Sequence, residues 1–352
     1  MRTMKAMQLI APRKPILAEL PIPRTPSDGL LLKTRCVSIC STDISFFEGH
    51  LFPAEYPIVL GHEYLGEVVD IGPDLDADIT LGDRIVYWGQ TDFDGLAEYR
   101  SLRPIFSGQT LRDTFPADRH FTDDHRAAAV RIPEDLGDLE ASFIEPITGA
   151  LRAILTHPPK PGDRVLILGT GPIGVIAGSI IGRMFAPQSI VSMDANPRRN
   201  GFAAEHFAQR AYLPGELAGQ VADNSYDYVF DALPTIKDIP EQDDPRRLAM
   251  RKLRPRGQYV LYGASQQMQK FDTWLMLAKG LNIGSAPFDV TSFPMHHTAS
   301  VIASAMHMLR SRTVDGRKLL STVCRFDDFD QVVEIFENYR TTTDLKTIVD
   351  FR

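Results

Sequence analysis

The sequence predicts an α/β protein that combines a β-rich domain with a doubly wound parallel-sheet domain, and three observations carry this prediction. Short β-like runs separated by Pro, Gly and Asp turns fill residues 1 to about 105. From about residue 161, strand patterns alternate with helical patterns, which is typical of a parallel sheet. The first of these later strands ends in a glycine-rich turn of the kind that binds dinucleotides.

In the first region, runs of β-branched and other apolar residues are bounded by turn residues. The expected strands span residues 30–36, 58–60, 67–71 and 84–88. Residues 100–126 fit neither pattern, because they hold two prolines, two histidines and many charges with little periodicity. We expect a long surface loop there, with a substrate lid or an arm between subunits as the alternative.

In the second region, apolar strands alternate with helical segments, one after the first strand and one from about residue 198. The expected strands span residues 164–168, 189–194, 226–232, 258–263 and 282–286. Beyond residue 288, the sequence predicts a helix over 298–312, a strand, a helix from 329 and a last strand over 346–351.

Composition limits the classes of partner that we expect. The 352 residues carry a formal net charge of −7 and no basic stripe, which argues against a nucleic-acid partner. No run of about 18 uncharged apolar residues occurs, so we expect no membrane partner. The three cysteines are too few for a disulfide framework, and together with the absence of a signal-peptide pattern they predict a cytoplasmic protein.

The clearest chemistry lies after the strand over 164–168. Gly169, Gly171 and Gly174 follow it with the spacing G-x-G-x-x-G, and Pro172 and Ile173 open a helix. Such glycines permit a tight turn, a close approach to a pyrophosphate and close packing of helix on strand, while the helix N-terminus supplies amide donors. The sequence therefore predicts a dinucleotide site at this turn.

Asp194 ends the next strand about twenty residues later, where a carboxylate binds the hydroxyls of the adenosine ribose. The same carboxylate repels a 2′-phosphate, so it favours NAD over NADP. Arg198 and Arg199 are the competing signal, because they could neutralise such a phosphate.

Cys40, His62 and Glu145 offer a thiolate, an imidazole and a carboxylate, which are the ligand types of a tetrahedral zinc site. Their wide separation along the chain leaves a second interpretation open, in which Cys40 and His62 are ordinary core residues. Glu63, beside His62, is a further polar residue in an otherwise apolar run.

Several motifs occur in order through nearly the whole chain. They are Cys40-Ser41-Thr42-Asp43, Gly61-His62-Glu63 with Gly66 and Gly72, Gly82-Asp83-Arg84, Gly95-Leu96-Ala97-Glu98-Tyr99, Glu145-Pro146 and the turn from Gly169 to Gly174. Together they resemble the zinc-dependent medium-chain dehydrogenases. The Glu-Pro pair resembles the polyol, sorbitol, glucose and cyclitol dehydrogenase branch of that family.

The resemblance implies a GroES-like catalytic domain in two parts, residues 1–148 and 289–352, interrupted by a Rossmann NAD-binding domain over 149–288. It implies Cys40, His62 and Glu145 as metal ligands, with Glu63 as an alternative ligand or as a tuning residue. Thr42 is similar to the residue that passes on the alcohol proton, and Asp43 lies beside the ligands. In the cofactor site it implies roles for Pro172, Ile173, Asp194 and Arg199, the last against the adenosine.

The implied reaction is reversible oxidation of a secondary hydroxyl of a polyol, cyclitol, aminocyclitol or sugar by NAD, at one catalytic zinc. Two departures from the family stand out. Ser45 replaces the histidine that often ends the proton relay, and no cysteine lies between Asp83 and Glu98, so we expect no structural zinc. Phe46 and Phe47 are read either as pocket walls or as core.

The alternatives are a zinc-free quinone or enone reductase of the same superfamily and a non-catalytic nucleotide-binding protein. Relatives pair through the edge of the Rossmann sheet, here near residues 282–286. The resemblance therefore implies a homodimer or a homotetramer that acts on a small-molecule alcohol or ketone.

Overall fold

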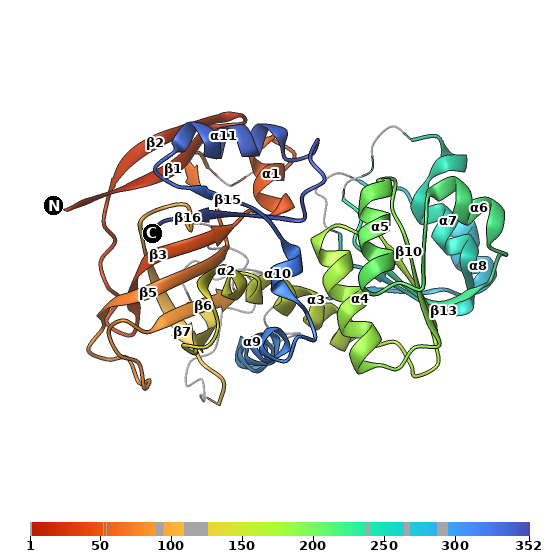
Figure 1. Cartoon of the computed structure of the whole chain (residues 1–352), viewed down its shortest axis with the longest axis horizontal. Helices are drawn as coiled ribbons and strands as arrows, with labels where there is room; N and C mark the ends of the chain where they lie inside the picture. Colours follow the sequence, from red (N-terminus) through yellow and green to blue (C-terminus); the bar gives the residue numbers. More distant parts are fainter. Residues whose placement is uncertain are drawn as a thin grey trace. The chain divides into compact units, whose positions relative to one another are not determined.

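The computed structural model describes residues 2–51, 53, 55–88, 94–108, 126–234, 236, 239–263, 268–286 and 295–352. The chain forms two compact units, one made of Met1–Gly149 with Pro287–Arg352 and the other of Ala150–Ala286 (Figure 1). The domain bounds expected from the sequence, 148/149 and 288/289, lie within two residues of these divisions. His120, His125 and most of the unusual segment lie outside the described residues.

The first unit is β-rich, as predicted. Its larger sheet has seven described strands in the order β15-β16-β3-β5-β6-β8-β7, and β7 also pairs with β3, so these strands curl back on themselves. Their bounds are β3 (Leu30–Ser38), β5 (Glu63–Ile71), β6 (Arg84–Trp88), β7 (Tyr99–Ile105), β8 (Arg126–Ile132), β15 (Leu320–Arg325) and β16 (Lys346–Asp350). A smaller sheet contains β2 (Lys14–Pro21), β1 (Thr3–Ala11) and β4 (Ile58–Val59).

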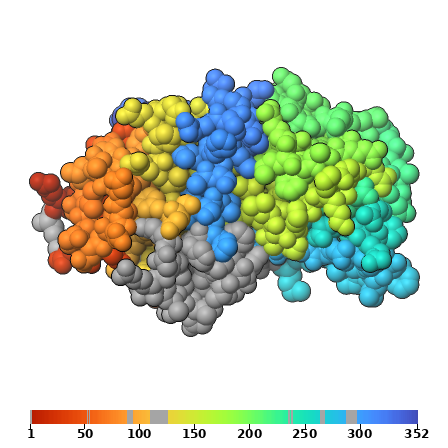
Figure 2. Space-filling view, turned by 90° about the horizontal axis from the view of Figure 1, so that it is seen from below, coloured from red at the N-terminus to blue at the C-terminus, as the bar shows by residue number. Residues whose placement is uncertain are grey.

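Both halves of the first unit contribute to one core. Strand β16 runs antiparallel to β3, and the helix α9 (Met295–Arg310) contacts β8, β6 and β7. Figure 2 shows the blue C-terminal residues lying against the orange and yellow N-terminal ones. The ring of Phe47 lies 5.5 Å from that of Phe336 in the helix α11 (Phe329–Asn338), so the last part of the chain closes the core.

The second unit confirms the predicted doubly wound sheet. Six strands, all parallel to their neighbours, follow the order β11-β10-β9-β12-β13-β14. They are β9 (Arg164–Leu168), β10 (Ser189–Met193), β11 (Arg210–Tyr212), β12 (Tyr226–Asp231), β13 (Leu253–Leu261) and β14 (Asn282–Ser285). The helices are α4 (Pro172–Met184), α5 (Pro197–His206), α6 (Pro214–Gln220), α7 (Pro245–Lys252) and α8 (Thr273–Lys279), and the helix α3 (Ile144–Thr156) leads into the unit.

Two strand starts differ from the sequence prediction. Strand β5 begins at Glu63 rather than at residue 67. The sequence pattern misses this start because Glu63 is charged and nevertheless buried. Strand β13 begins at Leu253 rather than at residue 258, and its pairing with β12 is irregular between Tyr226 and Tyr228. Pro255 and Gly257 near this irregularity hide the strand pattern in the sequence.

Among the described residues, no helix combines the length and the apolar character that crossing a bilayer requires.

Candidate active site

The pairing of two strands in the first unit brings Cys40 and His62 together. Strand β3 pairs with β5 so that Ser38 lies opposite Glu63. Cys40 lies two residues after the end of β3 and precedes the helix α1 (Ser41–Phe47), while His62 directly precedes β5. A thiol and an imidazole from distant parts of the chain therefore lie side by side.

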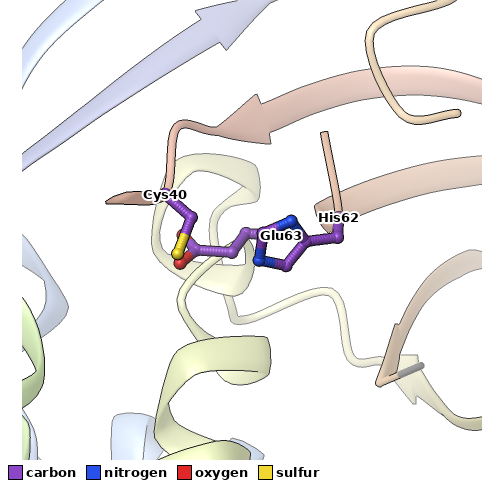
Figure 3. A group of neighbouring side chains, drawn as sticks. All are labelled: Cys40, His62 and Glu63. Atoms are coloured by element: carbon purple, nitrogen blue, oxygen red, sulfur yellow. The ribbon is translucent and has the colours of Figure 1, made fainter. Parts of the chain in front are cut away.

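Cys40, His62 and Glu63 form a group in which one ligand atom of each residue lies within 4.8 Å of the others. Figure 3 shows the sulfur and the carboxylate next to each other, with the imidazole ring beside them. His62 and Glu63 are buried, and Cys40 is partly exposed. A metal ion could thus be bound by the buried side chains of His62 and Glu63 and be open to solvent on the side of Cys40.

Gly61 gives the chain the conformation that presents His62. Its φ of +94° lies in the left-handed region that side chains disfavour. A Cβ atom at this position would also lie 2.9 Å from the backbone nitrogen of Leu96. The turn before the histidine therefore requires glycine.

Asp43 orients the imidazole from behind. Its Oδ1 lies 3.3 Å from Nδ1 of His62 and accepts from the backbone N–H of Gly61 at 2.9 Å, while its Oδ2 accepts from the N–H of Cys40 at 3.0 Å. Burial alone would raise the pKa of Asp43, but the charge of His62 and these hydrogen bonds hold its pKa below the ordinary value. A carboxylate on Nδ1 leaves Nε2 as the nitrogen that a metal would take.

Lys346 is the residue of this site that the sequence analysis missed. Its Nζ donates to both carboxylate oxygens of Glu63, and both side chains are buried. Burial would lower the pKa of Lys346, but the carboxylate of Glu63 outweighs this effect and raises it. The one indication in the sequence is a lysine at the start of the strand pattern that forms β16.

Glu145 lies in the first turn of α3 and is also buried. Burial, together with the charge of Glu63, raises the pKa of Glu145 to about 7 against the opposing influence of His62 and Lys346. Among the described residues, the group of close ligand atoms contains Glu63 and does not contain Glu145. The two carboxylates thus differ in state, one paired with a lysine and one easily protonated.

The thiol of Cys40 donates a hydrogen bond to the hydroxyl oxygen of Thr42 at 3.7 Å. Ser45, one turn further along α1, donates to the carbonyl of Ser41 at 2.9 Å and accepts from Arg340 at 3.3 Å. Arg340 also donates to Glu48 at 2.6 Å. A charged group therefore lies beside Ser45.

The glycine-rich turn of the second unit has the geometry that a dinucleotide requires. Gly169 adopts a φ of +82°, and a Cβ atom at Gly174 would lie 1.8 Å from the carbonyl oxygen of Gly169. The helix α4 begins directly after Gly171, with Pro172 and Ile173 in its first turn. Backbone N–H groups at this helix start have no partner within the helix and can bind phosphate oxygens.

Asp194 is held against this turn. Its Oδ2 accepts from the N–H of Thr170 at 2.7 Å, and its Oδ1 accepts from the N–H of Asn196 at 2.8 Å. A carboxylate has about four acceptor positions, so the ribose hydroxyls can still bind. Arg199 lies nearby, with one guanidinium nitrogen 4.0 Å from the place that a Cβ of Gly171 would occupy.

Both aromatic residues after Cys40 pack in or against the core. Phe47 is fully buried against Phe336 and belongs to the core, so the interpretation as a pocket wall is wrong for this residue. Phe46 is partly buried and packs against the same core.

Comparisons with known proteins agree with this description. Residues 26–102 match the family model of the alcohol dehydrogenase GroES-like domain. L-threonine 3-dehydrogenase of Shewanella woodyi is 31% identical over 215 residues, 59% of this chain and 62% of that protein. The chain thus spans less than two thirds of this relative's length.

Two further likenesses extend over most of the chain. A probable D-xylulose reductase A of Aspergillus clavatus is 23% identical over 94% of this chain and 91% of its own length. The crystal structure of a putative zinc-binding dehydrogenase from Sinorhizobium meliloti 1021, bound to NADP, has a TM-score of 0.75 at 20% identity, with full coverage of both chains. At this identity, the likeness to the Sinorhizobium meliloti structure shows that the two proteins share a fold.

Replacement of Lys346 tests the buried ion pair. We expect Lys346→Met to lower the free energy of unfolding by about 3–5 kcal/mol, because Glu63 is left buried without its counter-charge. Urea unfolding followed by circular dichroism measures the loss. Lys346→Arg, which restores a cation, should recover part of it.

Lys252→Met is the matched control. Lys252 is equally buried, but its carboxylate partner Asp223 is 42% exposed and can be solvated by water. We expect a smaller loss of stability in this variant. A loss for Lys346→Met that is no larger than the loss for Lys252→Met would contradict the expectation that a buried, unpaired Glu63 carries an extra cost.

Proposed function

We propose that this chain, which belongs to the medium-chain alcohol dehydrogenases, oxidises a secondary hydroxyl of a polyol, a cyclitol or a sugar to a ketone with NAD. The observation that carries the proposal is the convergence of Cys40, His62 and Glu63 in a chain that also has a dinucleotide turn. The relatives named above are a dehydrogenase of L-threonine and a probable reductase of D-xylulose, two small polar compounds.

A single zinc ion fits the donor set. A thiolate, an imidazole and a carboxylate match the ligand types of a catalytic zinc site, and their ligand atoms lie within 4.8 Å of one another, so small side-chain shifts would let them converge on one ion. Bound zinc supplies a Lewis acid that lowers the pKa of a coordinated hydroxyl. Glu63 can serve as the third ligand and still accept from Lys346, because a carboxylate has about four acceptor positions. In this proposal, Glu145 acts from nearby.

The chain's own residues orient the ligands and move the proton. Asp43 fixes the imidazole of His62. The hydroxyl of Thr42, beside the sulfur of Cys40, takes up the proton of the substrate alcohol and passes its own proton on to water. Asp194 binds the adenosine ribose and disfavours a 2′-phosphate, which supports NAD over NADP. A bound nicotinamide would supply the acceptor for the carbinol hydrogen as a hydride.

The runner-up is a zinc-free reductase of quinones or enones with the same fold. One observation favours it, because the pairing of Glu63 with Lys346 satisfies that carboxylate without any metal. The third candidate function is that of a nucleotide-binding protein that catalyses no reaction.

A substrate panel tests the proposal. We expect the purified, zinc-loaded chain to reduce NAD in the presence of at least one polyol, cyclitol or sugar, and to use NADP less well. The absorbance of the reduced nicotinamide measures the rate. Cys40→Ala should lower kcat/KM by more than about a hundredfold, since even residues that only support a metal ligand contribute 10–100-fold.

Turnover of quinones or enones by a protein that holds no zinc would instead support the runner-up. Binding of NADH without turnover of any compound would support the third candidate function.

The third ligand is tested by metal content. We expect Glu63→Gln to lose most of its zinc on dialysis against a weak chelator, because it removes one of three protein ligands. Glu145→Gln should retain zinc with an affinity lowered by at most about 100-fold. Elemental analysis measures the content, and circular dichroism verifies that each variant is folded. The reverse order of the two variants would assign the ligand role to Glu145.

We also propose that the protein is a homodimer or a homotetramer built through the edge of its parallel sheet. No described strand pairs with the outer edge of β14. On α8, which precedes β14 in the chain, Trp274 and Leu277 are 72% and 79% exposed, which is unusual for large apolar side chains. A second copy would cover both the edge and these side chains.

Leu277→Glu tests this assembly. We expect the charge to convert the oligomer to a smaller species, measured by light scattering after size-exclusion chromatography, because it buries an unpaired carboxylate at the contact. Leu81→Glu is the control, since Leu81 is 66% exposed in the other unit. An unchanged mass for Leu277→Glu would exclude this contact.

A further inference from the structure

A buried ion pair lies at the carboxyl ends of the strands of the second unit. Asp231 is the last residue of β12, and Arg246 lies in the first turn of α7. Nε of Arg246 donates to Oδ2 of Asp231 at 2.7 Å, and the hydroxyl of Tyr259 donates to the same oxygen at 2.8 Å. Asp231 is 0% exposed and Arg246 is 2% exposed, so the arrangement excludes water.

The remaining nitrogens of Arg246 hold the chain that follows β12. Nη2 donates to the carbonyls of Leu233 and Pro234 at 3.3 and 3.2 Å, and Nη1 donates to Oε1 of Gln269 at 2.8 Å. That amide oxygen also accepts from the backbone N–H of Ile236 at 2.9 Å. One guanidinium group thus fixes residues 233 and 234 directly and residue 236 through Gln269.

This segment lies against the dinucleotide turn. The N–H of Ala232 donates to the carbonyl of Leu168 at 2.9 Å, and a Cβ atom on Gly169 would lie 3.2 Å from the side chain of Leu233. On its other side, a Cβ atom on Gly263 would lie 1.8 Å from the carbonyl oxygen of Leu233. The backbone of residues 232–234 therefore fills the space between the turn and the end of β13.

The strand order tells which half of a dinucleotide this segment would meet. In a doubly wound sheet, the dinucleotide crosses the carboxyl ends of the strands at the point where the strand order reverses. Here β10 and β12 lie on opposite sides of β9. Asp194 follows β10, so a bound dinucleotide would place its adenosine half on that side and its nicotinamide half over β12 and β13.

We infer that Arg246 is a positioning residue for the nicotinamide half of the cofactor, because it fixes the backbone of residues 232–234 beside the phosphate turn. The inference rests on the proposed use of a nicotinamide dinucleotide. A lysine at this position would keep the charge opposite Asp231 but would lack the planar fork that reaches Leu233, Pro234 and Gln269.

A comparison of two ligands distinguishes binding of the nicotinamide half from binding of the adenosine half. NADH carries both halves, whereas ADP-ribose lacks the nicotinamide. We expect Arg246→Lys to bind NADH about tenfold more weakly, the equivalent of one good hydrogen bond, while its affinity for ADP-ribose stays within about twofold of the wild type. Titration calorimetry on the full chain measures both dissociation constants.

Arg254→Lys is the matched control. Arg254 pairs with Asp227 on the same two strands, β13 and β12, but near the opposite end of β12. It should bind both ligands as the wild type does. Gln269→Ala is the second test variant, because it removes part of the same support from a half-buried position and keeps the pair of Arg246 with Asp231. It should also lose NADH affinity selectively.

Equal losses for NADH and ADP-ribose, or no loss, in a folded Arg246→Lys variant would overturn the inference and leave the proposed function standing. If Arg246→Lys does not fold, the same comparison in Gln269→Ala decides. A wild-type chain that binds neither ligand would overturn the proposed function and this inference with it.

Discussion

The antiparallel pairing of β3 with β5 is the constraint on which the candidate site depends. Because Ser38 lies opposite Glu63, the residues just after one strand and at the start of the other meet at one end of the sheet. A shift of the pairing by one residue would turn Glu63 to the other face and separate it from Lys346. The buried side chains of β3 and β5 therefore fix the positions of Cys40, His62 and Glu63 as firmly as they fix the core.

Burial of charge is acceptable here because each charged group has a specific partner. Asp43 has His62 and two backbone donors, and Glu63 has Lys346. Glu145 is buried as well, and its burial together with the charge of Glu63 raises its pKa to about 7. The site thus contains carboxylates in two states, which is common where protons or metal ions are exchanged.

Local features of the fold could be predicted from the sequence, and non-local ones could not. The turn from Gly169 to Gly174 was predictable because its strand, glycines and helix are neighbours in the chain. The pairing of Lys346 with Glu63 joins residues that are 283 positions apart, and nothing near either one indicates the other. Strand β5 was expected too short because a buried carboxylate at its start contradicts the usual pattern of burial. The resemblance to a family supplied Cys40 and His62, and the structure added the partners that orient them.

The division of the first unit along the chain has a consequence for biosynthesis. The unit consists of residues up to Gly149 and from Pro287 onward, while the second unit is continuous. During translation at about 5–20 residues per second, the first half waits roughly 10–30 s for its complement. In that interval, Glu63 has no ammonium group to neutralise it and β3 lacks its neighbour β16. The nascent chain is therefore most exposed to aggregation and to chaperone capture while the continuous unit is still emerging from the ribosome.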